Sequence, residues 1–231
     1  MKRLVGIRPT GKLHLGHYFS VIKPALKFGC DVLIARYHAP YDYVEGRYQP
    51  LLDELKKFIP EHQIKDQELN LLMFFQMLTL ANAGELNRMT QYKSAKVKNA
   101  HLFIYPVLMA CDVAGYEEVY VGEDQRQHLE FANRMLLKWG CPAVKAKIVG
   151  GRIMSLNNPS EKMSKSNPEG CLFLSDATEV IKEKIKKAIT TQEGINNLKV
   201  LYKEFVGKEY NEKQNQKMKE KLAEAIIKKF K

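Results

Sequence analysis

The sequence contains little cysteine, a single tryptophan and no long apolar run. Its four cysteines lie thirty or more residues apart among 231 residues, so no C-x-x-C pair is present to build a zinc site or a thioredoxin-like motif. No window approaches 18 consecutive apolar residues, so no membrane-spanning helix is expected. The first residues enter a strand-like run without a signal-peptide core. These absences predict a cytoplasmic protein with free thiols and no membrane association.

Positive charge exceeds negative charge. Lys and Arg total 37 against 26 Asp and Glu, a formal net charge of +11. Such an excess favours anionic partners, namely nucleic acid, nucleotides or a membrane surface, although it also serves solubility alone. The hydrophobic fraction of 45% and the charged fraction of 27% are ordinary for a globular protein. A chain of this length and composition buries a core, which excludes a wholly disordered protein.

Strand-like and helical segments alternate in the first part of the chain. Residues 4–7 form a short apolar run, residues 13–28 carry apolar side chains at helical spacing, and residues 31–37 are again apolar. This strand–helix–strand opening predicts an α/β fold with a Rossmann-type parallel sheet, whose ligand lies at the carboxyl ends of the strands. The other expected elements are helices at 48–59, 78–88, 100–111 and 125–138, and strands at 70–76, 118–121 and 147–154.

From residue 176 onward the pattern is purely helical. Helices are expected at 179–188, 194–205 and 212–230. The change of pattern predicts two domains. Residues 1–170 form the α/β domain, and residues 171–231 form a small all-helical C-terminal domain.

A first candidate site lies between the first strand and the first helix, where residues 9–17 read Pro-Thr-Gly-Lys-Leu-His-Leu-Gly-His. Gly11 and Gly16 allow a backbone to approach a phosphate closely, and a helix start offers free N–H groups. His14 and His17, three residues apart, can both donate to phosphoryl oxygens as negative charge grows there. Spacing alone fits a turn with two exposed histidines equally well.

A second candidate site is the loop at residues 162–166, Lys-Met-Ser-Lys-Ser. Lys162 and Lys165 supply two positive charges and the serines supply two hydroxyls, which suits a triphosphate that the loop closes over. A solvated basic loop is the simpler interpretation of this segment by itself. Its occurrence after the first motif, in this order and on this type of fold, favours the phosphate-binding one.

The two motifs, HLGH and KMSKS, resemble the signatures of class I aminoacyl-tRNA synthetases. The segments between them, at residues 84–93, 105–112, 121–128 and 152–156, extend the resemblance to the tryptophanyl-tRNA synthetases. The resemblance covers residues 3 to about 190. It implies that ATP and L-tryptophan react, with Mg²⁺ assisting, to give tryptophanyl-adenylate, and that the aminoacyl group then moves to tRNA-Trp. A homodimer is implied as well.

The resemblance also assigns roles to individual residues, and no metal ligand is among them. The catalytic groups it implies are His14, His17, Lys162 and Lys165. The ATP-binding positions are Arg8, Pro9, Thr10, Gly16, His17, Lys93, Gly122, Glu123, Asp124, Ile153, Lys162, Met163, Ser164, Lys165 and Ser166. The tryptophan-binding positions are Leu4, His38, Tyr105, Met109, Asp112 and Gln125.

Within the tryptophan-binding set, Asp112 is the expected reader of the indole. A carboxylate only accepts hydrogen bonds, which suits the indole N–H donor. Met109, one helical turn earlier, gives a polarizable sulfur beside a flat ring. Tyrosyl enzymes usually carry Gln at the position of Met109, so tryptophan is favoured over tyrosine.

The chain departs from the resemblance in being short. The region between residues 37 and 84 is trimmed, and only 65 residues follow KMSKS. Anticodon reading is therefore left open. Two alternatives to a tryptophan–tRNA ligase follow: a synthetase-like tryptophan-binding paralogue that does not charge tRNA, and a tyrosyl-tRNA ligase. The single tryptophan, Trp139, is expected in the core.

Overall fold

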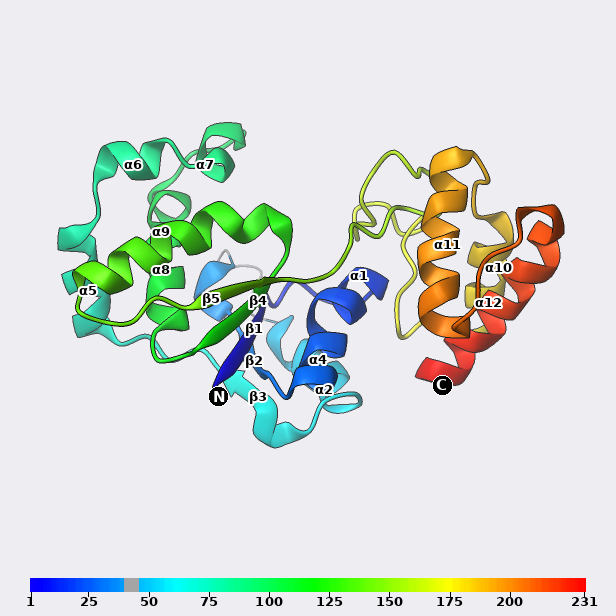
Figure 1. Cartoon of the computed structure of the whole chain (residues 1–231), viewed down its shortest axis with the longest axis horizontal. Helices are drawn as coiled ribbons and strands as arrows, with labels where there is room; N and C mark the ends of the chain where they lie inside the picture. The colour runs from blue at the N-terminus through cyan, green and yellow to red at the C-terminus, as the bar shows by residue number, and fades with distance from the viewer. Residues whose placement is uncertain (40–45) are drawn as a thin grey trace. The chain divides into compact units, whose positions relative to one another are not determined.

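A computed structural model describes residues 1–39 and 46–231 of the chain (Figure 1). Contacts within the chain divide it into two compact units. The first unit comprises Met1–Gly11 and Phe19–Gly150, and the second comprises Lys12–Tyr18 and Gly151–Lys231. The division thus falls at Gly150, before the composition change near residue 170, and it assigns the HLGH segment to the second unit.

The first unit is built on five parallel strands in the order β3-β2-β1-β4-β5. The strands are β1 (Arg3–Ile7), β2 (Asp31–Ile34), β3 (Ile64–Asp66), β4 (Glu118–Val121) and β5 (Lys145–Ile148). This order is that of a doubly wound sheet, and the predicted Rossmann-type parallel sheet is confirmed. The direction of winding reverses between β1 and β4, which is where such sheets bind their ligands.

Helices cover both faces of this sheet (Figure 1). The described helices of the first unit are α2 (Lys23–Phe28), α4 (Tyr48–Lys56), α5 (Leu71–Leu80), α6 (Ala83–Asn87), α7 (Thr90–Ser94), α8 (Ala100–Val113) and α9 (Arg126–Lys138). A π-helical turn at Tyr18–Ile22 leads into α2, which ends at Gly29 with φ 64°. A glycine suits this left-handed helix end because it has no Cβ.

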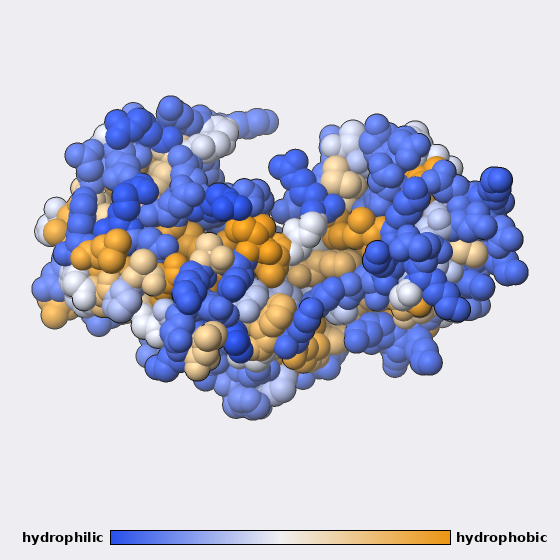
Figure 2. All heavy atoms as spheres, viewed as in Figure 1, coloured by the Kyte–Doolittle hydropathy of each residue, from blue (hydrophilic) through white to orange (hydrophobic). Residues whose placement is uncertain are grey.

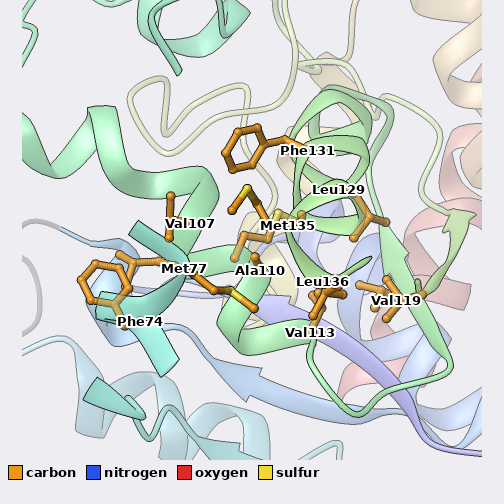
Figure 3. Packing of buried hydrophobic residues seen from close by; sticks show 14 of the residues in the cluster. Phe74, Met77, Val107, Ala110, Val113, Val119, Leu129, Phe131, Met135 and Leu136 are labelled. Carbon is orange, nitrogen blue, oxygen red and sulfur yellow. The ribbon is translucent and has the colours of Figure 1, made fainter. Parts of the chain in front are cut away.

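A hydrophobic core lies between the sheet and helices α5, α8 and α9 (Figure 3). Phe74 and Met77 of α5 meet Val107 and Ala110 of α8 there, and Met135 enters from α9 (Figure 3). Burial of such side chains is the main favourable term in folding, at about 1.5–3 kcal/mol each. This core fixes α8, the helix that carries Tyr105, Met109 and Asp112, three of the six predicted tryptophan-binding residues.

The segment expected as a strand at residues 70–76 is instead the helix α5, so that prediction is wrong. Asn70 caps the helix by accepting a hydrogen bond from the Met73 N–H at 3.0 Å. A short apolar run does not distinguish a buried strand from a buried helix, because both lack a polar face. The third strand is β3, which is three residues long and has two charged residues, Lys65 and Asp66.

Two smaller predictions also change. The last strand ends at Ile148, earlier than expected, and Met154 forms an isolated antiparallel bridge with Lys162. Trp139 is not a core residue, because it is 37% exposed and its indole N–H donates to the Gln76 side chain at 3.2 Å.

The second unit contains three long helices and the short helix α1 (Leu15–His17). The long helices are α10 (Thr178–Lys187), α11 (Gln192–Val206) and α12 (Asn215–Phe230), close to the predicted bounds. Helix α12 packs against both of the others through an apolar stripe that includes Leu222 and Ile226. Within the described residues, every helix is too short or too polar to cross a membrane.

Candidate active site

In the first unit, polar residues follow the carboxyl ends of four neighbouring strands. Arg8 follows β1, His38 follows β2, Gln67 follows β3, and Gly122–Gln125 follow β4. Since the strands are parallel, these segments lie at one edge of the sheet. Parallel topology therefore gathers groups that lie far apart in the sequence.

Asp112, near the end of α8, is the centre of a buried hydrogen-bond network at this edge. Its side chain is 9% exposed. Its Oδ2 lies 2.6 Å from His38 Nε2, and the amide nitrogen of Gln67 donates to Oδ1 at 2.7 Å and to Oδ2 at 2.8 Å. Buried charge is tolerated only when it is hydrogen-bonded in this way. Asp112 is thus a fixed acceptor and not a surface carboxylate.

Three aromatic rings line up beside this network. The ring of Tyr105 lies 4.2 Å from that of His38 and 5.4 Å from that of His128. Burial raises the pKa of Tyr105, so its hydroxyl stays protonated. Burial is the main cause that lowers the pKa of His128 to about 4, and the charge of the nearby His38 is a second cause. This imidazole is therefore neutral. The Nδ1 atoms of His38 and His128 are buried without a hydrogen-bond partner among the described residues.

Met109 and Leu4 belong to the apolar side of the same region. Met109 is 9% exposed and Leu4 is 2% exposed, and both are part of the core of Figure 3. The i, i+3 relation places Met109 and Asp112 on one face of α8. Leu4, Met109 and the Asp112 carboxylate therefore all belong to the first unit.

The loop after β4 borders a cleft of about 490 Å³ within the first unit. Residues of α7 and the segment 123–130 line it, including Asp124, Gln125 and His128. At Gly122 a Cβ would lie 2.5 Å from Asp124 Oδ1, so a larger residue would displace that carboxylate. Lys93 lies on α7 and is exposed, but it is not among the residues that line the cleft.

The segment Arg8–Thr10 turns sharply after β1. The Thr10 N–H donates to the Arg8 carbonyl at 2.8 Å, and Gly11 follows with φ 100°, a conformation that favours glycine. Pro9 is buried and Arg8 is exposed. The positive charge of Arg8 partly opposes the rise in the pKa of Tyr105. The Arg8 guanidinium therefore lies near Tyr105 of α8.

In the second unit, the HLGH segment forms the capped start of α1. Nδ1 of His14 accepts from the Gly16 N–H at 3.0 Å, and Nδ1 of His17 accepts from the His14 N–H at 3.2 Å. With Nδ1 used as an acceptor, the proton of each neutral imidazole is on Nε2. A Cβ at Gly16 would lie 2.7 Å from the His14 ring, so the motif needs glycine there. Both histidines are thereby prepared as Nε2–H donors.

The HLGH segment is held beside the KMSKS loop by backbone pairing within the second unit. The Leu15 N–H donates to the Leu172 carbonyl at 3.1 Å, and the Leu174 N–H donates to the Leu13 carbonyl at 2.9 Å. Burial, together with the charges of Lys165 and Lys162, lowers the pKa of His14 to about 4. His14 is therefore neutral, and the two sequence motifs are electrostatic neighbours.

A hairpin positions the KMSKS loop. The Met163 N–H donates to the Ile153 carbonyl at 2.8 Å, and both side chains are 2% exposed. The Ser164 and Ser166 hydroxyls lie 2.8 Å apart. One backbone group of each buried residue is therefore paired, namely the Ile153 carbonyl and the Met163 N–H.

Three asparagines that sequence reasoning missed support this loop. Asn167 donates to Asn157 Oδ1 at 2.8 Å across the loop base. Asn197 of α11 accepts from the Met154 N–H at 3.0 Å and donates to its carbonyl at 2.9 Å. Nothing in spacing alone signals these contacts, since they join residues that are 10 and 43 positions apart in the sequence.

The predicted residues thus fall into two groups, one in each unit. The first unit holds Leu4, Arg8, Pro9, Thr10, His38, Lys93, Tyr105, Met109, Asp112 and Gly122–Gln125. The second holds His14, Gly16, His17, Ile153 and residues 162–166. Gln67 and His128 join the first group as additions from the structure.

Comparison with known proteins decides the family. The model of the tRNA synthetases class I (W and Y) matches residues 57–231. The chain belongs to this family. It is accordingly an aminoacyl-tRNA ligase of class I.

Curated relatives are similar over nearly the whole chain. The tryptophan–tRNA ligase of Caldanaerobacter subterraneus subsp. tengcongensis is 35% identical over 284 residues, covering 100% of this chain and 86% of the relative. That of Halalkalibacterium halodurans is 34% identical over 287 residues, covering 98% of this chain and 84% of the relative. These spans exceed the 231 residues of this synthetase, so the relatives carry additional residues inside the matched region.

Solved structures agree. The tryptophanyl-tRNA synthetase of Mycoplasma pneumoniae superposes with a TM-score of 0.81 at 27% identity, covering 100% of this chain and 85% of the other. The tyrosyl-tRNA synthetase of Aeropyrum pernix, at 22% identity and a TM-score of 0.75, shares the fold, with coverage of 99% and 83%.

Proposed function

We propose that this synthetase activates L-tryptophan with ATP and transfers it to tRNA-Trp. The observation that carries the proposal is the buried Asp112 carboxylate beside the apolar Met109, at the carboxyl edge of the sheet. An acceptor-only group suits the indole N–H, and a thioether suits a flat ring. The curated relatives similar to this chain, which are tryptophan–tRNA ligases, support the same substrate.

The reaction proceeds in two steps without a covalent enzyme intermediate. A carboxylate oxygen of tryptophan attacks the α-phosphorus of ATP, the bond to the bridging oxygen of the β-phosphate breaks, and pyrophosphate leaves. A hydroxyl at the 3′ end of the tRNA then attacks the carbonyl carbon of the adenylate, and AMP leaves. Positioning and charge neutralisation supply the catalysis.

In the first unit, we assign the amino-acid contacts to the α8 edge. Tyr105 and Gln125 hold the substrate ammonium group, while His38 and Leu4 line the pocket. Arg8–Thr10 and Lys93 are assigned to ATP. Gly122, Glu123 and Asp124 are assigned to the ribose, since the Asp124 carboxylate accepts from sugar hydroxyls.

In the second unit, we assign the phosphates to the two signatures. The Nε2–H groups of His14 and His17 donate to phosphoryl oxygens as charge develops, which is supported by the bonds that occupy both Nδ1 atoms. Lys162 and Lys165 neutralise the leaving pyrophosphate, with Ser164 and Ser166 as further donors and Gly16 giving close backbone approach. Ile153 and Met163 hold adenine through their backbones.

Mg²⁺ enters this scheme as part of the substrate, bound to the phosphates of ATP. Among the described residues, no three His, Cys, Asp or Glu side chains gather in a way that would hold a metal ion. The donors that do gather around the KMSKS loop are cationic, and these bind phosphate and not a metal. Mg²⁺ is commonly bound by oxygen ligands, and these often include the phosphates of a substrate.

We also propose that the synthetase forms a homodimer through the outer face of α5. This helix is apolar except for Gln76 and Thr79, and its inner face packs in the core of Figure 3. Its outer face leaves Leu71, Leu72 and Phe75 between 60% and 70% exposed. Apolar surface is visible where α5 lies (Figure 2). A helix that is hydrophobic all round is normally covered on both sides.

Residues 1–170 are proposed as the activation domain and residues 171–231 as a reduced helical C-terminal domain, in a protein that works in the cytoplasm. The basic surface of the helices suits a tRNA backbone, and affinity for tRNA would then fall steeply with salt.

Charging of a tRNA-Trp transcript with labelled tryptophan tests the function. We expect charging with tryptophan and none with tyrosine in the same assay. Charging with tyrosine instead would overturn the substrate assignment. Pyrophosphate exchange without charging would indicate a paralogue that activates tryptophan but does not charge tRNA. A tRNA with an altered anticodon, run in parallel, shows whether the anticodon is read.

A further inference from the structure

Gln67 is a buried polar residue that the assigned roles leave unused. It is 3% exposed and follows β3 directly. Asp66 fixes its backbone, because Oδ1 of Asp66 accepts from the Gln67 N–H at 2.9 Å and Oδ2 accepts from Arg36 at 2.6 Å. The end of β3 is thereby tied to the end of β2.

The orientation of the Gln67 amide is set by its other partner. Its Oε1 accepts from the Tyr37 N–H at 2.7 Å, and a backbone N–H can only donate. The NH₂ group therefore faces Asp112, to which it donates at 2.7 Å and 2.8 Å. The amide cannot flip without placing its oxygen against a carboxylate.

The two carboxylate oxygens of Asp112 accept different numbers of hydrogen bonds. Oδ2 receives two donors, from His38 at 2.6 Å and from Gln67 at 2.8 Å. Oδ1 receives one, from Gln67, and accepts no other hydrogen bond among the described residues. A carboxylate oxygen has about two acceptor sites, so the open site of this group is on Oδ1.

We propose that Gln67 is a positioning residue that holds Asp112 with Oδ1 open toward the substrate, so that the pocket selects an amino acid whose ring carries an N–H donor. The proposal rests on the proposed function and extends it. In this assignment Gln67 acts through Asp112, to which it donates, so its effect depends on the substrate's N–H.

Replacement of Gln67 with Met tests this with a pair of ligands of the same shape. Met keeps the length of the side chain but removes both the donor and the acceptor. Binding of tryptophan and of β-(3-benzothienyl)alanine, in which sulfur replaces the indole N–H, is measured by calorimetry on the full chain. We expect Q67M to weaken tryptophan binding about tenfold and to leave analogue binding within about twofold. Q49M, the same change on the exposed face of α4, should alter neither.

The outcomes separate the possible failures. Equal loss of both ligands would mean that Gln67 only maintains the pocket, and no loss would mean that Asp112 needs no positioning; either result overturns the proposal. If wild type binds no tryptophan, the proposed function itself fails. In a D112A background, Q67M should have no further effect on tryptophan binding, and a persistent tenfold loss would again contradict the proposal.

A second variant covers the case in which Q67M does not fold. Q67E keeps the size of the side chain and its acceptor for the Tyr37 N–H, but it replaces the donor with a carboxyl group. The two carboxyl groups then share a proton at low pH and repel each other once it is lost. Tryptophan binding by Q67E should therefore weaken as pH rises, while analogue binding stays level. A pH-independent affinity for tryptophan would count against the proposal.

Discussion

Two buried imidazoles, one in each unit, carry a measurable cost when they are protonated. His128 is 3% exposed and His14 is 7% exposed, and the pKa of each is lowered to about 4 from an ordinary value of 6.5. The largest cause in both is burial, which disfavours the charged ring. The neutral state that burial enforces at His14 is also the state that presents an Nε2–H to a phosphate while Nδ1 accepts.

Stability should fall as pH drops from about 6.5 to about 4. In that window each histidine binds a proton in the unfolded state but not in the folded state, so acid favours unfolding. Above about pH 6.5 the imidazoles are neutral in both states, and they no longer lower the free energy of unfolding. For His128 the loss is at most about 3 kcal/mol. We expect His128→Phe, which keeps a ring against Tyr105, to reduce the difference in unfolding free energy between pH 7 and pH 4.5.

Urea denaturation at the two pH values measures this difference. His62→Gln, a change at an exposed histidine, is the control and should leave it unchanged. The His14 contribution has the same sign and remains in the variant, so the pH dependence should shrink without vanishing. An undiminished difference in His128→Phe would show that this ring does not stay neutral by burial.

Single residues also show where sequence reasoning stopped. Asp112, His38 and Tyr105 were reached through the resemblance, and the structure brings them together within the first unit. Gln67 was not reached, because a strand expected at residues 70–76 leaves it ahead of a strand and far from the carboxyl edge. Once β3 is placed at Ile64–Asp66, Gln67 follows a strand end, which is where a ligand-binding residue is expected.

Among the elements, α10 has an unusual end. Lys219, on α12 and only 7% exposed, donates to the Lys186 carbonyl at 3.1 Å and to the Ala188 carbonyl at 2.6 Å. These carbonyls lie at the helix end, where no further turn supplies a partner. The ammonium group also meets the negative end of the helix dipole. Burial lowers the pKa of Lys219, the expected cost of enclosing this charge.

Replacing Lys219 with Met should destabilise the second unit by about 1–3 kcal/mol, because two carbonyls lose a charged donor while the packing is nearly kept. Urea denaturation measures the loss. Lys217→Met, on the exposed face of the same helix, is the matched control and should change stability by less than about 0.5 kcal/mol. Equal effects of the two changes would show that Lys219 does not cap α10.

The long C-terminal helices were predictable because their apolar stripes recur at helical spacing over several turns. Helix α5 was not, because it is apolar on its inner and outer faces alike and its period is hidden. The apolar outer face has a reason in the proposed dimer, in which a second copy of the chain covers it.

For the whole molecule, the proposed dimer rests on the exposed face of α5. Phe75 is 61% exposed on that face. A two-fold interface uses the same patch on both copies, so Phe75→Lys acts twice, at about 1.5–3 kcal/mol per buried ring. We expect the dissociation constant of the dimer to rise by more than about a hundredfold.

Sedimentation velocity over a range of concentrations measures the shift. Leu26→Lys, on α2 of the same unit and 50% exposed, is the control and should remain dimeric. A wild-type protein that sediments as a monomer throughout would overturn the proposed dimer. Loss of the dimer in both variants would place the interface elsewhere.

By itself, the sequence determined the class of fold and the two signatures. Alternation of apolar strands with amphipathic helices is a local pattern, and so is the fixed spacing within HLGH and within KMSKS; local patterns can be read along one chain. Tertiary structure alone decided which distant residues meet. It joined Gln67 to Asp112, paired residues 13–15 with residues 172–174, and exposed one face of α5. Such contacts depend on strand order and packing. These bring together segments that are far apart in the sequence, and the local pattern of one segment does not predict which other segment it contacts.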